Sequence, residues 1–310
     1  MLKIYLVTGV AGFIGSHIAE ELLKDGKNVI GIDNFYSGKK ENIEYLQNIS
    51  SGHFNFIEID IRDIISLKKL FSEYNIDYVF HQAAIASVQK SIENPVFTNE
   101  VNVQGTLNIL EASRENGVKK IVFASSAAVY GDEPTLPKNE NSIIKPISPY
   151  GLEKYICEEY LKLYSNLYGL KSVALRYFNV YGERQDPSSE YSGVISIFDN
   201  KIKNGETITI FGDGEQYRDF IYVKDVVQAN INAMWMDTGD FNIFCVGTGE
   251  KTTVNDLVNV LQTKYDSSSK IAYTKARRGD IEGSVCDNTK LLNHGLIINQ
   301  VPIHEGIVLL

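Results

Sequence analysis

The sequence predicts an α/β protein whose main part is a doubly wound parallel sheet, accompanied by a smaller α/β lobe. Three observations support this fold class. Short apolar runs alternate with longer amphipathic segments through the first 180 residues. Most of these runs are apolar throughout, which is typical of parallel strands buried on both faces. This alternation of apolar runs and amphipathic segments changes after about residue 177. A βαβ succession of this kind places ligands beyond the carboxyl ends of the strands.

The elements of the first part follow from these runs in order. Apolar runs bounded by polar or glycine residues predict strands at 4–8, 28–33, 54–60, 78–81, 120–125 and 172–177. The amphipathic segments between them predict helices at 12–24, 64–74, 95–116 and 149–168.

The remaining chain predicts a smaller set of elements. Residues 207–211, the turn 212–214 and residues 220–223 are typical of a strand, a tight turn and another strand. Helical patterns follow at 223–235 and 253–263, with an apolar strand at 241–246 that we expect to return to the main sheet.

Composition excludes several functional classes. The 30 basic and 39 acidic residues give a net charge of −9 without a basic stripe, so we expect no nucleic-acid partner. No apolar stretch approaches the length that spans a bilayer, so no membrane partner is expected. The three cysteines are scattered and the five histidines dispersed, which predicts no metal site and fits a reducing cytoplasm.

The first expected strand leads into a glycine-rich turn, T-G-V-A-G-F-I-G, at residues 8–15. Gly9 permits a sharp turn, Gly12 lets the backbone approach a pyrophosphate, and Gly15 allows close packing of helix on strand. The N-terminus of the following helix offers N–H groups and a positive dipole to that pyrophosphate. A tight βα turn without a ligand would also explain three glycines.

An acidic residue at the end of the second strand strengthens the case for a dinucleotide. Asp33 lies where a carboxylate can bind the adenosine ribose hydroxyls. Its charge would repel a 2′-phosphate, so NAD is favoured over NADP. We therefore predict a Rossmann-like NAD site.

Tyr150 and Lys154 form the candidate catalytic pair. At a spacing of i,i+4 they lie on one face of the helix expected at 149–168. A lysine and an oxidised nicotinamide near the phenol would favour the phenolate, which can remove a hydroxyl proton while hydride leaves for NAD. Chance alone supplies about one such spacing in a chain this rich in tyrosine, and Tyr36/Lys40 is one, in an expected loop.

Ser126 is the expected partner of Tyr150. It lies at the carboxyl end of the fifth strand, in the segment S-S-A-A-V-Y-G at 125–131. A hydroxyl there can bond the reacting oxygen and relay its proton to Tyr150. A serine at a strand end also commonly caps a turn.

Together these motifs resemble the extended short-chain dehydrogenase/reductase family. The resemblance covers nearly the whole chain. Its further motifs are D-I-R at 60–62, H-Q-A-A at 81–84, N-V-Q-G-T at 102–106, R-Y-F-N-V-Y-G at 176–182, G-D-G-E-Q-Y-R-D-F at 212–220 and R-R-G-D at 277–280. The segment G-E-R-Q-D-P at 182–187 is most similar to nucleotide-sugar 4-epimerases of the UDP-N-acetylglucosamine/UDP-glucose type.

The resemblance implies a set of site residues. The cofactor set is Gly9, Gly12, Phe13, Ile14, Gly15, Asp33, Asn34, Asp60, Ile61, Ala83, Ala84, Tyr150, Lys154 and Tyr177. The substrate set is Ser87, Ser125, Ser126, Tyr150, Asn179, Phe211, Arg218, Arg277, Asp280 and Ser284. In the substrate set Phe211 is expected against uracil, while the two arginines hold the diphosphate because a guanidinium fork pairs well with phosphate oxygens.

The same resemblance implies domain limits and a mechanism. Residues 1–177 with about 225–247 would bind NAD, and about 178–224 with 248–310 would bind the UDP-sugar. Tyr150, assisted by Ser126, would remove the C4 hydroxyl proton as hydride passes to NAD. The 4-keto sugar would turn and take hydride back on its other face. Relatives commonly form homodimers through two helices, here those expected at 95–116 and 149–168.

Three alternatives are weighed against this activity. Sugar 4,6-dehydratases need an Asp-Glu pair where this chain has Ala127 and Ala128, which cannot perform acid–base chemistry. A UDP-glucuronate 4-epimerase or decarboxylase stays open, and so does an NAD-binding sensor without catalysis, although sensors commonly lose the Tyr/Lys pair. Ser284 is small where relatives restricted to UDP-glucose and UDP-galactose carry tyrosine, so we expect both plain and N-acetylated sugars to be accepted.

Overall fold

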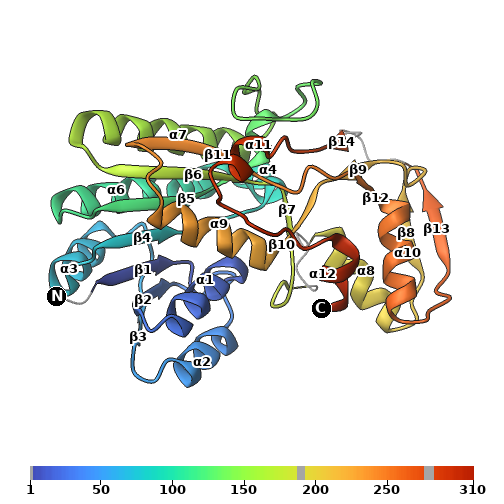
Figure 1. Cartoon of the computed structure of the whole chain (residues 1–310), viewed down its shortest axis with the longest axis horizontal. Helices are drawn as coiled ribbons and strands as arrows, with labels where there is room; N and C mark the ends of the chain where they lie inside the picture. The colour runs from blue at the N-terminus through green and yellow to red at the C-terminus, as the bar shows by residue number, and fades with distance from the viewer. Residues whose placement is uncertain (1–2, 187–192, 276–282) are drawn as a thin grey trace. The chain divides into compact units, whose positions relative to one another are not determined.

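A computed structural model gives the structure of the chain, and it describes residues 3–186, 193–275 and 283–310. The chain divides into two compact units (Figure 1). The first consists of Met1–Glu133, Ile143–Arg176 and Val227–Phe244. The second consists of Pro134–Ser142, Tyr177–Val226 and Cys245–Leu310.

A seven-stranded sheet forms the centre of the first unit. Its strands in spatial order are β11 (Phe241–Val246), β6 (Lys171–Tyr177), β5 (Lys120–Ser126), β4 (Tyr78–His81), β1 (Ile4–Thr8), β2 (Asn28–Asp33) and β3 (Phe54–Glu58). The pairs from β3 through β2, β1 and β4 to β5 are parallel. The order 3-2-1-4-5-6 is that of a doubly wound dinucleotide-binding sheet, whose order reverses between β1 and β4. The predicted fold class is confirmed, as is the return of β11 to the sheet.

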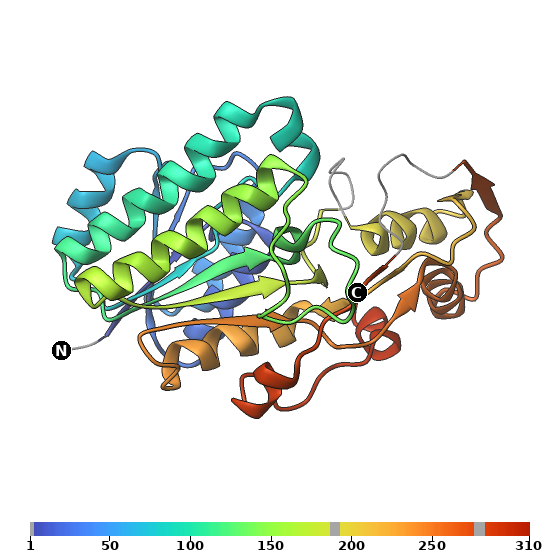
Figure 2. The same cartoon turned by 90° about the horizontal axis from the view of Figure 1, so that it is seen from above.

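Helices cover both faces of this sheet. Figures 1 and 2 show α3 (Ile64–Tyr74), α6 (Gly105–Glu115) and α7 (Pro149–Tyr168) on one face, and α1 (Phe13–Lys24) and α9 (Val223–Trp235) on the other. α2 (Lys40–Ile49) packs against α1, while the short α4 (Val88–Glu93) packs against α7. Because both faces are covered, the strand interiors are fully buried, for example Leu6, Val79 and Ile121.

The prediction of one continuous helix at 95–116 is wrong for the middle of the segment. The segment consists of α5 (Pro95–Asn99), a π-helical turn η1 (Glu100–Gln104) and α6. A π-turn admits one extra residue per turn and is common near functional sites. The backbone carbonyl of Asn102 in this turn accepts hydrogen bonds from the Thr106 hydroxyl at 2.6 Å and the Cys157 thiol at 3.2 Å. Side chains therefore help to satisfy this turn.

The described part of the second unit holds three small sheets. β7 (Asn179–Tyr181) pairs with β10 (Phe220–Tyr222), and β8 (Ile208–Phe211) pairs with β13 (Ile271–Thr274). β9 (Tyr217–Arg218) lies between β12 (Thr252–Thr253) and β14 (Gly283–Ser284). The helices described there are α8 (Val194–Lys203), α10 (Val254–Lys264), α11 (Thr289–Asn293) and α12 (Ile303–Val308).

The strands expected at 207–211 and 220–223 are present as β8 and β10, and each pairs in parallel with a strand distant in sequence. One expected domain limit needs correction. Residues 134–142 were expected with the first unit but lie in the second, where Lys138 pairs with the backbone of Val285 and Asp287. Among the residues that the structure describes, no helix is long and apolar enough to cross a membrane.

Candidate active site

The turn between β1 and α1 accepts only glycine at two of its positions. Gly9 has φ of +66°, and a Cβ there would lie 2.8 Å from the backbone nitrogen of Ala83. A Cβ on Gly15 would collide with the carbonyl oxygen of Gly9. Gly12 is the N-cap of α1 and supplies no side chain to its first turn, which begins with Phe13 and Ile14. The N-terminus of α1 offers N–H donors to an anionic group.

Asp33 at the end of β2 holds this turn in place. Its carboxylate accepts the N–H of Ala11 at 3.0 Å and the N–H of Phe35 at 2.8 Å. Burial raises the pKa of Asp33, and these backbone donors act in the opposite direction. A carboxylate has about four acceptor positions, so it can also receive ribose hydroxyls.

The other expected cofactor residues follow neighbouring strands. Asn34 donates to Asp60 at 2.9 Å, and the Arg62 guanidinium lowers the pKa of Asp60 to about 2. The expected strand 54–60 ends at Glu58, so Asp60 belongs to the loop. Ile61 is buried, while Ala83 and Ala84 form the loop after β4 and are partly exposed.

Tyr150 and Lys154 share the inner face of α7. Ser148 caps this helix by accepting the N–H of Gly151 at 3.1 Å. The Lys154 Nζ donates to the carbonyl of Ala124 at 2.7 Å and lies 5.9 Å from the centroid of the Tyr150 ring. Burial lowers the pKa of Lys154 to about 8. Burial also raises the pKa of Tyr150 to about 12, so deprotonation of the phenol requires a further positive charge nearby.

Ser126 and Tyr150 are brought together at the end of β5. The Ser126 hydroxyl lies near the phenol of Tyr150 and favours the phenolate, which opposes the effect of burial on the pKa of Tyr150. Ser126 Oγ also accepts the N–H of Ala128 at 3.1 Å, which starts the short helix η2 (Ala127–Tyr130). Ser126 therefore caps η2, and its catalytic role stays a prediction.

Ser125 takes part in a buried network. Its side chain is buried and donates to Glu158 at 2.5 Å, and Glu158 also pairs with Arg176 at 2.7 Å. Arg176 also donates to the hydroxyl of Tyr130 at 2.9 Å. Ser125 therefore supports the end of β5, and its contact with the substrate stays a prediction. Arg176 lies in a motif that predicts no role for it, and Glu158 lies outside the motifs.

Two further predicted residues have structural partners of their own. Ser87 is buried and caps α4, where its hydroxyl accepts the N–H of Lys90 at 3.1 Å. Tyr177 is buried and is the last residue of β6. Neither observation excludes a ligand contact, and both residues remain predictions.

The second unit brings three expected substrate residues to one strand segment. Ser284 of β14 is in register with Arg218 of β9. Asn179 donates to the backbone carbonyl of Asp219 through both its N–H, at 3.1 Å, and its side-chain amide, at 3.0 Å. Phe211 ends β8, and its carbonyl accepts the Gln216 amide at 2.7 Å. Arg277 and Asp280 lie outside the described residues.

Asp219 is the residue that holds this segment together, although the sequence assigned it no role. Its buried carboxylate accepts the N–H and hydroxyl of Thr248 at 2.8 and 2.7 Å, the N–H of Gly249 at 2.9 Å and the N–H of Cys286 at 3.0 Å. Burial raises the pKa of Asp219, whereas the four donors lower it. One side chain thus ties β9 to the segments that follow β11 and β14.

The fold and these motifs define a class of protein. Residues 5–247 match the model of the NAD dependent epimerase/dehydratase family, so the chain belongs to this family. A UDP-glucose 4-epimerase of Mycolicibacterium smegmatis is 40% identical over 303 residues, which cover 97% of this chain and 95% of that protein.

Solved structures show the same similarity. UDP-glucose 4-epimerase from Thermotoga maritima with UDP-glucose is 42% identical, with a TM-score of 0.92 over 99% of this chain and 96% of that one. UDP-N-acetylglucosamine 4-epimerase from Methanobrevibacter ruminantium, in complex with UDP-N-acetylmuramic acid, is 40% identical with a TM-score of 0.93 over the same shares. A Thermus thermophilus UDP-glucose 4-epimerase complex with NAD is 40% identical with a TM-score of 0.88 over 99% and 97%.

Proposed function

We propose that this chain interconverts UDP-hexoses that differ in configuration at C4, with NAD as a resident cofactor and a 4-keto sugar as the transient intermediate. The observation that carries the proposal is the approach of the Ser126 hydroxyl to the phenol of Tyr150 at the end of β5, with Lys154 one helical turn further along α7. Relatives at 40% identity or more that cover nearly the whole chain are named UDP-sugar 4-epimerases, which supports this reaction.

The residues of the first unit fit NAD. Gly9 and Gly15 keep the start of α1 close to the neighbouring backbone, because a Cβ on either would collide with Ala83 or Gly9, and Asp33 supplies a carboxylate at the end of the next strand. Gly9, Gly12 and Gly15 would receive the pyrophosphate, with Asp33 on the adenosine ribose. When bound, NAD accepts hydride from C4 of the sugar and returns it.

The side chains of this chain supply the proton chemistry. The phenolate of Tyr150 removes the proton of the C4 hydroxyl, and Ser126 bonds the same oxygen and relays the proton. Lys154, together with the positive charge of oxidised NAD, lowers the pKa of Tyr150 from its buried value of about 12. Tyr150 then returns the proton to the C4 oxygen after the sugar has turned.

The UDP portion must stay fixed while the sugar turns. Asn179, Arg218 and Arg277 are proposed to hold it, with Phe211 against the uracil. Grouping of Asn179, Arg218 and Ser284 around residues 217–220 supports a single nucleotide-sugar site in the second unit. The chain is acidic overall, so local donors must attract two diphosphates against a net charge of −9.

The alternatives are less well supported. Ala127 and Ala128 in η2 offer no acid or base for a 4,6-dehydratase. An NAD-binding sensor would not need the Ser126–Tyr150 pair. A UDP-glucuronate 4-epimerase of Thermodesulfobacterium geofontis is 35% identical over 310 residues, below the 40% and 42% of the UDP-sugar 4-epimerases named above.

A panel of UDP-sugars with product identification tests the function. The wild type should interconvert UDP-glucose with UDP-galactose and also UDP-N-acetylglucosamine with its 4-epimer, because Ser284, in register with Arg218, carries a small side chain. Tyr150→Phe should lower kcat on every sugar by about 10²–10⁴-fold. Ser284→Tyr should suppress the acetamido pair first.

The result that refutes the proposal is no turnover of any UDP-sugar by wild type that binds NAD. Turnover of UDP-glucuronate alone would replace the substrate class. Loss of both hexose pairs in Ser284→Tyr would refute only the assignment of Ser284.

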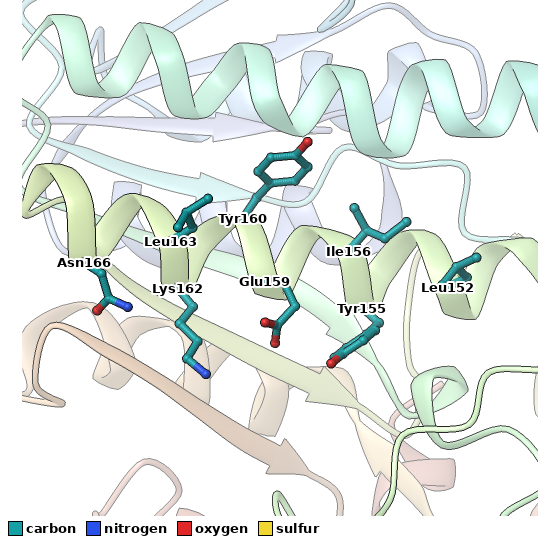
Figure 3. A pocket seen from close by; sticks show the side chains of 8 residues that line it. All are labelled: Leu152, Tyr155, Ile156, Glu159, Tyr160, Lys162, Leu163 and Asn166. Atoms are coloured by element: carbon teal, nitrogen blue, oxygen red, sulfur yellow. The ribbon is translucent and has the colours of Figure 1, made fainter.

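A homodimer in the cytoplasm is part of the proposal. An open apolar depression of about 490 Å³ runs along the outward side of α7 and is lined by Leu152, Tyr155, Ile156, Glu159, Tyr160, Lys162, Leu163 and Asn166 (Figure 3). Ile92 of α4 and Val96 of α5 are also largely exposed, and both helices pack against α7. Apolar side chains gathered in this way favour contact with a second copy through α7. The three cysteines are free thiols, which fits a reducing compartment.

A further inference from the structure

Beneath the turns after β1 and β4 lies a buried chain of polar side chains that the proposed reaction does not use. The hydroxyl of Thr8, the last residue of β1, accepts the N–H groups of Gln82 and Ala83, each at 3.1 Å. The same hydroxyl lies 2.7 Å from Nδ1 of His81, the last residue of β4. Thr8 and His81 are both essentially inaccessible to solvent.

The chain continues from His81 into the π-turn. His81 Nε2 lies 3.0 Å from the Thr106 hydroxyl, which donates to the carbonyl of Asn102. The Asn102 side chain accepts the N–H of Ile85 at 2.7 Å and donates to Glu153 of α7 at 2.6 Å. The chain thus extends from the first turn to the helix that carries Tyr150 and Lys154.

Only one direction of hydrogen bonding satisfies every group in the chain. A carbonyl can only accept a hydrogen bond, so the Thr106 hydroxyl donates its proton to the carbonyl of Asn102. The Thr106 oxygen must therefore accept a hydrogen bond from His81 Nε2–H. In a neutral ring Nδ1 is then an acceptor, and it receives the Thr8 proton. Thr8 already accepts two N–H groups, so a second ring proton on His81 would face no free acceptor there. Burial and the charge of Lys154 lower the pKa of His81 to about 3, which keeps the ring neutral.

The chain lies where the two turns touch. A Cβ on Gly9 would lie 2.8 Å from the backbone nitrogen of Ala83 and 2.9 Å from its Cα. Ala83 is also the residue whose N–H the Thr8 hydroxyl receives. The spacing between these turns is therefore set by Thr8 and, through it, by His81.

We infer that neutral His81 is a positioning residue for the dinucleotide, which fixes the turn at Gly9 against the turn at Ala83 and Ala84 through the Thr8 hydroxyl. The inference rests on the proposed function, since those turns are the ones assigned to NAD. His81 itself touches neither cofactor nor substrate. Its ring acts by keeping the Thr8 oxygen free to accept two backbone N–H groups.

Variants of two residues test the inference. His81→Phe keeps an aromatic ring but removes both hydrogen bonds, and Thr8→Val keeps the side-chain shape but removes the hydroxyl. Thr8→Ser restores the hydroxyl. Val79→Ala is the matched control, because it truncates a buried residue of the same strand and leaves every hydrogen bond of the chain in place. For each protein, freed of nucleotide, the dissociation constants for NAD and for UDP are measured. The midpoint of thermal unfolding is measured alongside them.

We expect His81→Phe and Thr8→Val to weaken NAD binding by about tenfold or more, with UDP binding changed less than twofold. Thr8→Ser should recover NAD affinity to within about threefold of wild type. Val79→Ala should lower the thermal midpoint but keep NAD affinity. The inference is overturned if His81→Phe binds NAD as tightly as wild type does. It is also overturned if Val79→Ala, at the same thermal midpoint as His81→Phe, loses as much NAD affinity as His81→Phe does. A wild type that binds no NAD overturns the proposed function as well.

Discussion

At the scale of single residues, the first unit buries charged and polar side chains near the carboxyl end of β5. Glu158 and Arg176 are an almost fully buried ion pair, with side chains 0% and 3% exposed. Removal of one member of such a pair typically costs about 3–5 kcal/mol because the other charge stays buried. The pair also forms hydrogen bonds with Ser125, the residue before Ser126 in β5, and with the hydroxyl of Tyr130.

The neutrality of His81 predicts a pH dependence of stability. The pKa of His81 is about 3 in the folded protein and 6.5 without burial. As the pH falls below 6.5, the unfolded chain therefore binds a proton at His81 while the folded chain does not. The contribution of His81 to stability is therefore fully present above pH 6.5 and is lost toward pH 3, by up to about 1.4 kcal/mol per pH unit.

Urea unfolding at several pH values between 7 and 4 measures this effect. The stability advantage of wild type over His81→Phe should shrink steadily as the pH falls. Parallel stability curves for the two proteins would show that His81 is protonated in the fold or exposed to solvent.

At the scale of elements, the second unit depends on a few short strands. β9 and β14 have two residues each, so their own hydrogen bonds fix little. Asp219 compensates by accepting donors from Thr248, Gly249 and Cys286, which lie in two separate segments. The orientation of Arg218 and Ser284 thus depends on one buried carboxylate.

Asp219→Asn should therefore weaken UDP binding by about tenfold or more, because one oxygen that accepts becomes an amide that donates toward N–H groups. Binding of NAD should change less than twofold. Asp266→Asn is the control, since it makes the same charge change at an exposed position of the same unit. Calorimetric titration with each nucleotide measures both affinities. An unchanged UDP affinity in Asp219→Asn would contradict the role of this carboxylate.

At the scale of the whole molecule, the outward face of α7 presents exposed apolar side chains among the residues that the structure describes. Leu152 and Leu163 are each almost half exposed on this helix. A charged side chain in a buried interface lacks a partner and opposes association. The proposed homodimer therefore depends on these two positions.

The double variant Leu152→Glu with Leu163→Glu should shift the protein from dimer to monomer in sedimentation equilibrium. Ile65→Glu on α3 replaces an equally apolar and more exposed residue, and it should leave the dimer intact. A wild type that sediments as a monomer at all concentrations would refute the dimer.

The sequence by itself determined the doubly wound sheet and the family, because apolar runs and glycine spacing are local properties. Five of the six strands and three of the four helices expected in the first part agree with the structure to within one residue. The π-turn was not predictable, since its carbonyl at Asn102 is satisfied by Thr106 and by a cysteine 55 residues away in α7.

Only the tertiary structure decided which motif residues face one another. Tyr150, Lys154 and Ser126 were found from their spacing and their place at strand or helix ends. The roles of His81, Glu158 and Asp219 depend on hydrogen bonds to residues distant in sequence, for example Thr8 with His81 across 73 positions. Burial makes such bonds obligatory, because an unpartnered polar group in the interior is costly, and burial is a property of the folded chain.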